Sequence, residues 1–246
     1  MSKVALITGS ARGLGRAIAE ALARDGCALF LVDILADRLE QTRAELSARG
    51  IRVEILATDI ASRANCLAAV DAAVAIYGRI DVMVNAAGIV RFNHALQVPE
   101  AEFAQIMAVN LAAPFWFAQA AIPHLIAAKG NLINIVSQSA QMGAPYIVPY
   151  ATSKAGLVQM TKSLAMEYMD APIRINAVSP GTMATEIGTG VTRPDDIDMA
   201  KVLRYSGQRP PSDAAEVAAV VAFVASDRAS AIHGAVINAD TGVTAG

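Results

Sequence analysis

Short apolar segments alternate with amphipathic, alanine-rich segments along the whole chain. The apolar segments are rich in β-branched residues and predict strands at residues 4–7, 28–32, 52–56, 82–84, 131–136, 174–178 and 235–237. The segments between them predict helices at residues 13–24, 36–49, 62–77, 100–128, 150–169 and 213–225. Apolar strands that alternate with helices are typical of a parallel sheet covered on both faces. The pattern therefore predicts a doubly wound, Rossmann-type α/β fold.

No linker, repeat or low-complexity tract interrupts this pattern, so residues 1–246 are expected to form one domain. Residues 182–211 are an irregular stretch in which glycine and proline recur. A connection of this length is uncommon in a compact domain unless it has a function. We therefore expect a substrate lid or binding loop there, and the alternative is a surface insertion without a function.

The composition narrows the range of partners. Hydrophobic residues make up 54% of the 246 residues and charged residues 17%, which allows a large core and argues against disorder. A net charge of -2 without any basic run gives no electrostatic basis for binding nucleic acid or an anionic membrane. Cys27 and Cys66 are too few for a disulfide framework and indicate buried thiols in a reducing compartment.

The lengths of the apolar segments indicate where in the cell the protein is expected to be. The N-terminal segment is too short for a signal peptide, and others, such as residues 217–225, are far shorter than a membrane span. We therefore expect a cytoplasmic protein that has no membrane partner.

Three glycines follow the first predicted strand and open the first predicted helix. Gly9, Gly13 and Gly15 allow a tight turn and a close approach of the backbone to phosphate groups, with Arg12 and Leu14 in the same turn. The amino terminus of a helix offers N–H groups and a positive dipole end to a pyrophosphate. Three residues separate the first two glycines, instead of the single residue of the commonest Rossmann fingerprint. A purely structural turn is the alternative, but the position at the first strand-to-helix turn favours a dinucleotide.

Asp33 closes the second predicted strand. A carboxylate there can accept hydrogen bonds from the adenosine ribose and repels a 2′-phosphate, which favours NAD over NADP. Arg12 argues for NADP, because a guanidinium near the phosphate-binding turn can pair with a 2′-phosphate. We give Asp33 more weight, since a dianionic phosphate beside a carboxylate is costly. The alternative is that Asp33 only caps the following helix.

Further candidate residues follow the third and fourth predicted strands. Asp59, followed by Ile60, is placed to hydrogen-bond the adenine amine or to cap the next helix. Asn85, Ala86 and Gly88 end the fourth strand, where small residues let a cofactor lie across the strand end. A tight turn without a ligand is also compatible with them.

Tyr150 and Lys154 lie one helical turn apart and so share a helix face. A tyrosine is a poor base at neutral pH, because the pKa of a free phenol is about 10. The positive charge of Lys154 would favour the phenolate and lower that pKa, as would an oxidised nicotinamide. Tyr150 could then exchange a proton with an alcohol or a carbonyl. Ser137, at the end of the fifth strand, could hydrogen-bond the same substrate oxygen, and Asn110, in the long helical region, could hold a water for proton relay.

Together these residues resemble the short-chain dehydrogenase/reductase family. The similarity extends over essentially the whole chain, at residues 8–15, 85–88, 110, 137, 150–154 and 180–181. The resemblance implies a seven-stranded sheet and a catalytic tetrad of Asn110, Ser137, Tyr150 and Lys154. It also implies a homotetramer, formed through the helices at residues 100–128 and 150–169.

The same resemblance implies individual contacts. Lys154 would also hold the nicotinamide ribose, Thr185 would contact the nicotinamide carboxamide, and Asn85 would support the central sheet. The remaining expected cofactor contacts are Tyr150, Pro180, Gly181 and Met183. Two departures from the family pattern remove no catalytic group: Ala86 replaces a second asparagine, and residues 240–242 replace Asp-Gly-Gly.

Substrate is expected beside Ser137 and Tyr150, under the irregular stretch. Its candidate contacts, which mix polar and apolar side chains, are His94, Gln138, Ser139, Tyr146 and Ile187. This mixture suits a medium-sized secondary alcohol or ketone, such as a cyclic alcohol, a steroid-like molecule, a polyol or a 3-hydroxyacyl compound.

Other chemistry has less support in the sequence. The three histidines are widely separated and lack cysteine or acidic neighbours at ligand spacing, so no metal site is expected. The Gly-x-Ser-x-Gly motif of many hydrolases does not occur. We therefore predict an NAD-dependent oxidoreductase. The alternatives are an NADPH-dependent 3-oxoacyl-thioester reductase and a non-catalytic, dinucleotide-binding redox sensor.

Overall fold

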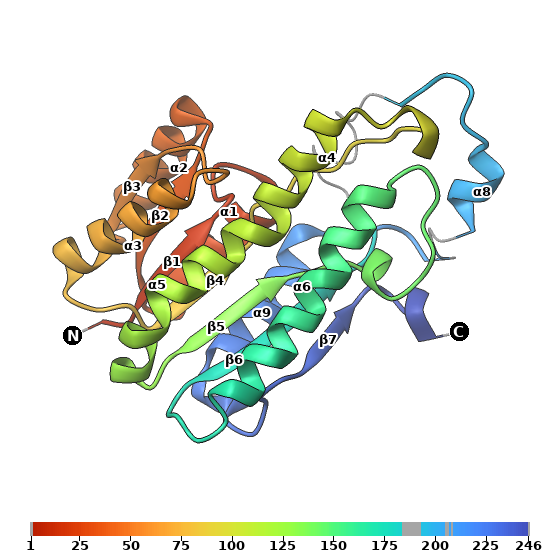
Figure 1. The fold of residues 1–246 in the computed structure, drawn as a ribbon. Coiled ribbons are helices and arrows are strands. Elements are labelled where there is room, and N and C mark those ends of the chain that lie inside the picture. The colour runs from red at the N-terminus through yellow and green to blue at the C-terminus, as the bar shows by residue number, and fades with distance from the viewer. Residues whose placement is uncertain (1, 184–192, 205–206, 208, 246) are drawn as a thin grey trace.

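The computed structural model describes residues 2–183, 193–204, 207 and 209–245. Its centre is a seven-stranded parallel sheet in the order β3-β2-β1-β4-β5-β6-β7 (Figure 1). The strands are β1 (Val4–Thr8), β2 (Ala28–Asp33), β3 (Val53–Ala57), β4 (Val82–Asn85), β5 (Asn131–Ile135), β6 (Arg174–Pro180) and β7 (Val236–Ala239). The strand order reverses between β1 and β4. Ligands of open α/β sheets bind at such a switch point, outside the carboxyl ends of the strands.

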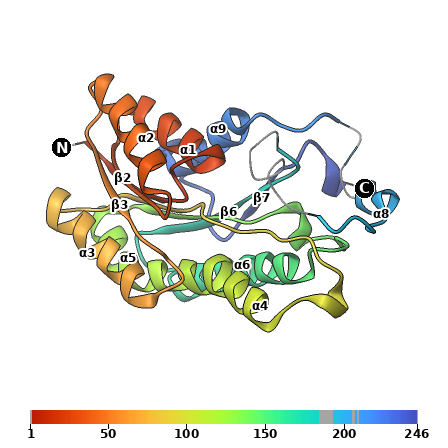
Figure 2. The ribbon, with the colours of Figure 1, turned by 90° about the horizontal axis from the view of Figure 1, so that it is seen from above.

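Helices cover both faces of this sheet (Figure 2). One face carries α1 (Gly13–Arg24), α2 (Ala36–Ala48) and α9 (Ala214–Ala225), and the other carries α3 (Arg63–Tyr77), α4 (Glu100–Met107), α5 (Ala113–Ala128) and α6 (Val148–Glu167). Successive side chains of a strand point to opposite faces, so Leu6 packs in one core layer and Ile7 in the other. Both side chains are fully buried, which explains why the strands read as continuous apolar runs.

The predicted fold class is confirmed, and every predicted strand and helix is present with bounds shifted by a few residues. Two local details differ from the prediction. The long helix at residues 100–128 contains a π-helical turn at Ala108–Ala112. Ser137 lies two residues beyond the end of β5, where it precedes a short 3₁₀ turn, Gln138–Ala140.

The predicted irregular stretch contains some regular structure. A short helix, α8 (Met199–Leu203), lies within it, and Met183 forms a parallel bridge to Ser212. The Asp198 carboxylate caps α8 by accepting a hydrogen bond from the N–H of Ala200 at 2.9 Å.

Residues 100–128 together form a helix of 29 residues that is long and apolar enough, by length and composition, to cross a membrane. A helix was predicted at these residues, but the apolar segments were expected to be far shorter than a membrane span, and this one is not. Its α5 part packs on the sheet, where Phe117 and Leu125 are fully buried. A core helix of a soluble protein satisfies the same criterion, and the packing of α5 is that of a core helix.

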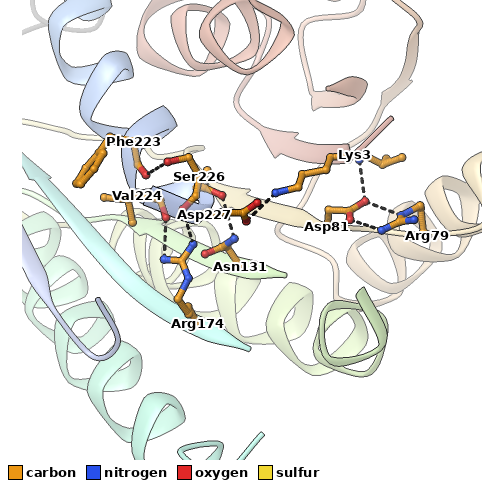
Figure 3. Close-up of polar contacts among 11 residues, drawn as sticks. Lys3, Arg79, Asp81, Asn131, Arg174, Phe223, Val224, Ser226 and Asp227 are labelled. Atoms are coloured by element: carbon orange, nitrogen blue, oxygen red, sulfur yellow. Dashed lines mark hydrogen bonds and ion pairs between the residues drawn. The ribbon is translucent and has the colours of Figure 1, made fainter. Parts of the chain in front are cut away.

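A buried carboxylate joins the amino ends of β1 and β4, at the edge of the sheet opposite the carboxyl ends (Figure 3). Asp81, directly before β4, accepts hydrogen bonds from the N–H of Val4 at 2.9 Å and from the guanidinium of Arg79 at 2.8 Å. The backbone of Asp81 also lies very close to Gly130. A Cβ atom there would lie 2.2 Å from the carbonyl oxygen of Asp81, so only glycine fits.

The same edge also holds the end of α9 (Figure 3). Arg174 donates to the carbonyl oxygens of Val224 and Ser226 at 2.9 and 3.0 Å, and Asn131 donates to that of Ala225 at 3.0 Å. The last carbonyl groups of a helix lack partners within the helix. Side chains from the first residues of β5 and β6 therefore satisfy them and fix α9 against the sheet.

We expect Asp81→Asn to lower the free energy of unfolding by about 1–3 kcal/mol, because the Arg79 guanidinium loses a buried charged partner. Denaturant unfolding would measure the change. Asp71→Asn, at an exposed position of α3, is the matched control. Equal stability of the two variants would contradict the role assigned to Asp81.

Candidate active site

The turn between β1 and α1 has glycine where the backbone requires it. Gly9 and Gly13 have positive φ angles of 69° and 55°. A Cβ atom at Gly9 would lie 2.7 Å from the Cα atom of Ala87, and one at Gly15 would lie 2.0 Å from the carbonyl oxygen of Gly9. At the N-cap position of α1, Arg12 makes no side-chain cap, which leaves backbone N–H groups of the first turn for a ligand.

A pocket of about 400 Å³ lies at this turn and extends across the switch point. Nine residues that the sequence predicted to bind the cofactor line it: Gly9, Arg12, Leu14, Gly15, Asp33, Asp59, Ile60, Ala86 and Gly88. Thr58, Arg91 and Gln105 also line the pocket and were missed as cofactor contacts. Thr58 directly follows β3, which is the signal that could have found it. Gln105 lies on α4, and nothing in the sequence marks it.

The Asp33 carboxylate holds two parts of the pocket wall. Its Oδ2 accepts a hydrogen bond from the N–H of Ala11 at 2.9 Å, and its Oδ1 accepts one from the N–H of Leu35 at 3.0 Å. Leu35 is the N-cap residue of α2, so Asp33 is not the cap of that helix. Each carboxylate oxygen has a second lone pair, so Asp33 can also accept a hydrogen bond from a ribose hydroxyl.

Asp59 and Ile60 form the next part of the wall. Asp59 Oδ1 accepts from the N–H of Ala61 at 2.9 Å, whereas the N-cap residue of α3 is Ser62. The Cys66 thiol donates to the carbonyl oxygen of Ile60 at 3.1 Å. Burial raises the pKa of Cys66 to about 12, so this thiol stays protonated at physiological pH and keeps its donor role.

Buried polar side chains fix the end of β4. Asn85 donates to Asn134 Oδ1 at 2.8 Å, and Asn134 donates to the hydroxyl of Thr161 on α6 at 2.9 Å. The hydroxyl of Thr8 accepts hydrogen bonds from the two N–H groups that follow Asn85, each at 3.1 Å. The strand end is therefore tied to β1 and α6, which is the geometry expected of a supporting role for Asn85.

Asn110 is fully buried in the π-helical turn. Its Oδ1 accepts from the N–H of Ile89 at 2.8 Å, while its Nδ2 donates to the Ile89 carbonyl at 2.9 Å and to Ser153 Oγ at 3.1 Å. A Cβ atom on Gly88 would lie 3.5 Å from Asn110 Oδ1 and 3.4 Å from Lys154 Nζ. Asn110 thus holds the segment after β4 against α6, beside the lysine. Such π-helical turns are frequent at functional sites.

The ammonium group of Lys154 is buried, with 3% of the residue exposed. It donates to the carbonyl oxygen of Ile135 at 2.7 Å and lies 5.9 Å from the centroid of the Tyr150 ring. Burial lowers the pKa of Lys154 from 10.5 to about 8. At neutral pH the group is a buried cation, and an ammonium has three N–H donors, of which Ile135 takes one.

Tyr150 is half-buried in the first turn of α6, directly after Pro149, the second residue of the helix. Ser137 lies beyond β5, on the turn that packs against α6. The Ser137 hydroxyl accepts hydrogen bonds from the N–H of Ser139 at 3.2 Å and from its hydroxyl at 3.0 Å. The proton of Ser137 Oγ can therefore be donated to a substrate oxygen.

The structure places the predicted substrate contacts in two groups. Gln138 and Ser139 are buried in the turn after β5. His94 and Tyr146 instead form hydrogen bonds with the described part of the predicted lid. Ile187 lies outside the described residues.

The predicted contacts near the nicotinamide end of the cofactor follow β6. Pro180 is the last residue of β6 and Met183 forms the bridge noted above. A Cβ atom on Gly181 would lie 2.8 Å from the Cα atom of Asp240, so glycine is required there. Thr185 lies outside the described residues.

These features fit a dinucleotide. The glycine turn places the start of α1 against the pocket, small residues line it after the end of β4, and a carboxylate lies at the end of β2. The pocket reaches Gly88, which is next to Lys154 Nζ. A ligand that fills the pocket would therefore extend from Asp33 towards the lysine.

The chain is similar to known proteins over nearly its whole length. A family model described as enoyl-(acyl carrier protein) reductase matches residues 9–244. D-threitol dehydrogenase from Mycolicibacterium smegmatis is 36% identical over 243 residues, which cover 98% of this chain and 93% of that protein. The chain belongs to the short-chain dehydrogenase/reductase family.

Solved structures similar to this short-chain dehydrogenase/reductase have the same fold. A dehydrogenase/reductase from Sinorhizobium meliloti matches with a TM-score of 0.89 at 31% identity, covering 99% of this chain and 96% of that one. A 3-ketoacyl-(acyl-carrier-protein) reductase from Brucella melitensis, in complex with NADH, matches with a TM-score of 0.88 at 29% identity and 98% coverage of both chains. The protein is therefore an oxidoreductase that uses a nicotinamide cofactor and acts on CH–OH groups.

Replacing Lys154 by methionine tests the free-energy cost of burying a charged ammonium group. Below pH 8 the folded and unfolded states both hold the Lys154 proton, so the folded state bears the whole of this cost. Between pH 8 and pH 10.5 the unfolded state holds more protons than the folded state, so the wild type gains stability as the pH rises. Relative to Lys154→Met, we expect a gain of up to about 3 kcal/mol over this range.

Denaturant unfolding of both proteins from neutral pH to pH 10.5 measures this difference. Other buried groups that titrate there, such as Cys27, are common to both proteins and cancel. A stability difference that stays constant with pH would contradict the burial of a charged Lys154.

Proposed function

We propose that this protein is an NAD-dependent dehydrogenase that oxidises a secondary alcohol, or reduces the ketone in reverse, with Tyr150 as the general acid and base. One observation supports this most strongly. The buried ammonium of Lys154 lies 5.9 Å from the centroid of the Tyr150 ring, on the same face of α6. A cation at that distance favours the phenolate form of the tyrosine.

The four side chains of the tetrad then have distinct roles. The nicotinamide, when bound, accepts or supplies the hydride at the substrate carbon. Tyr150 Oη takes the proton of the alcohol, or returns it to the carbonyl, and Ser137 Oγ donates a hydrogen bond to the same substrate oxygen. Lys154 keeps the phenolate stable and offers its remaining N–H donors to the nicotinamide ribose. Asn110 positions the backbone at Ile89, and a water held at its turn would relay the proton.

The preference for NAD rests on Asp33. Its carboxylate lines the pocket at the end of β2, and two backbone N–H groups hold it in place. A dianionic 2′-phosphate at this wall would be repelled, whereas ribose hydroxyls would donate to it.

A second function is an NADPH-dependent 3-oxoacyl-thioester reductase. Arg12 lines the same pocket and supplies a guanidinium that a 2′-phosphate could pair with. The structural similarity to a 3-ketoacyl-(acyl-carrier-protein) reductase supports this class of substrate, although that structure holds NADH. The relative named D-threitol dehydrogenase instead supports a small polyol.

We further propose that the enzyme is a cytoplasmic homotetramer assembled through α4, α5 and α6. Large apolar side chains are partly exposed on these helices: Phe103 on α4, Phe115 on α5 and Met166 on α6. Burying such side chains against a second copy is favourable.

Replacing Tyr150 by phenylalanine removes only the phenolic oxygen. We expect kcat for alcohol oxidation to fall by a factor of about 10² to 10⁴, because the proton acceptor is lost, while the Kd of NAD stays unchanged. Tyr168→Phe, at the other end of α6, is the matched control. Substantial activity in Tyr150→Phe would exclude the proposed mechanism.

Asp33→Asn tests the choice of cofactor and keeps an oxygen that can accept a backbone hydrogen bond. We expect kcat/KM with NADP to improve at least about tenfold relative to NAD, since the repulsion of the 2′-phosphate is removed. Initial rates with both cofactors measure this ratio. An unchanged ratio would mean that Asp33 does not select the cofactor.

A further inference from the structure

Polar and aromatic contacts join the loop after β4 to residues 193–204. His94 Nε2 lies 2.9 Å from Asp196 Oδ1, and the His94 ring packs edge-on against Tyr146 with ring centroids 5.3 Å apart. The Tyr146 hydroxyl accepts a hydrogen bond from the N–H of Asp198 at 2.9 Å. Three segments that are distant in sequence therefore meet at Tyr146.

Tyr146 has an unusual backbone conformation. Its φ angle is +65°, in the left-handed region that residues with a Cβ atom rarely adopt. Its carbonyl oxygen accepts a hydrogen bond from the N–H of Asn93 at 2.8 Å. Strained residues persist where the surrounding contacts over-determine them. Tyr146 stands four residues before Tyr150, so these contacts fix the segment that leads into α6.

Two apolar side chains of residues 193–204 pack beside Tyr150. Ile197 and Val202 pack in one cluster with Met142 and Tyr150. The guanidinium of Arg193 also lies over the ring of Phe92, 4.8 Å from its centroid. In Figure 1, α8 lies at the end of the molecule where α6 begins. The segment therefore forms a wall next to the residue proposed to move the proton.

We propose that His94, Tyr146 and Asp196 form a clasp that holds residues 193–204 beside Tyr150 and thereby determines substrate affinity. This inference rests on the proposed function, because it takes the substrate to bind at Tyr150. His94 Nε2 and Tyr146 Oη are already engaged with residues 193–204. The clasp residues are positioning residues and not substrate ligands.

The clasp and the catalytic side chains have separate supports. Lys154 is held by the Ile135 carbonyl, and Asn110 is held by the backbone of Ile89 and by Ser153. None of these hydrogen bonds involves a clasp residue. Opening the clasp should therefore raise KM for the substrate and leave kcat unchanged.

Hydrogen–deuterium exchange of the 246-residue protein tests the clasp without any substrate. In His94→Ala we expect amides of residues 193–204 to exchange about tenfold faster, because the hydrogen bond to Asp196 and the edge-on ring contact with Tyr146 are both lost. His94→Gln, which keeps a donor towards Asp196, should recover part of the protection. Asp195→Ala is the matched control, because this exposed carboxylate makes no ion pair with the described residues.

Kinetics with a secondary alcohol complete the test. For His94→Ala we expect KM to rise about three- to tenfold, with kcat and the Kd of NAD unchanged. Equal exchange rates in His94→Ala and Asp195→Ala would overturn the clasp. A fall in kcat at constant KM would also overturn it, since His94 would then act in the chemical step. If the wild type oxidises no alcohol, the proposed function fails, and the exchange measurement still decides whether the clasp exists.

Discussion

A charged lysine inside the protein is the constraint on which the candidate site depends. Burying the Lys154 ammonium costs about 3 kcal/mol, judged from the fall of its pKa to about 8. The same helix offsets this cost, since Leu157 is fully buried in the core and Lys154 Nζ keeps a hydrogen bond to Ile135. In return, the cation is held 5.9 Å from the centroid of the Tyr150 ring, and no carboxylate among the described residues raises its pKa.

The two edges of the sheet have different roles: contacts at the amino edge stabilise the fold, and the carboxyl edge carries the candidate active site. At the amino edge, Asp81 and Arg174 satisfy backbone groups and hold the strands and α9 together. At the carboxyl edge, the glycine turn, the end of β2 and the residues after β4 line a pocket, and Lys154 of α6 lies beside its wall at Gly88. Parallel strands make this division possible, since all their carboxyl ends lie on one side.

The sequence predicted those parts of the site that depend on local pattern. Alternating apolar segments gave the fold, and the glycines, Asp33 and the Tyr150–Lys154 spacing located the pocket and the lysine. What escaped prediction depends on contacts between distant segments. Gln105 reaches the pocket from α4, and the amide of Asn110 binds the Ile89 backbone because a π-helical turn aims it there. His94 and Tyr146 read as substrate contacts, yet the structure joins both to residues 193–204.

The most direct test of the proposed reaction is the initial rate of change in reduced-nicotinamide absorbance. The purified protein would be supplied with a panel of secondary alcohols and ketones and with each of the four nicotinamide forms. We expect turnover with NAD and one class of alcohol, and slower turnover with NADP. Tight binding of NAD with no turnover of any member of the panel would contradict the proposal and favour a dinucleotide-binding protein without this activity.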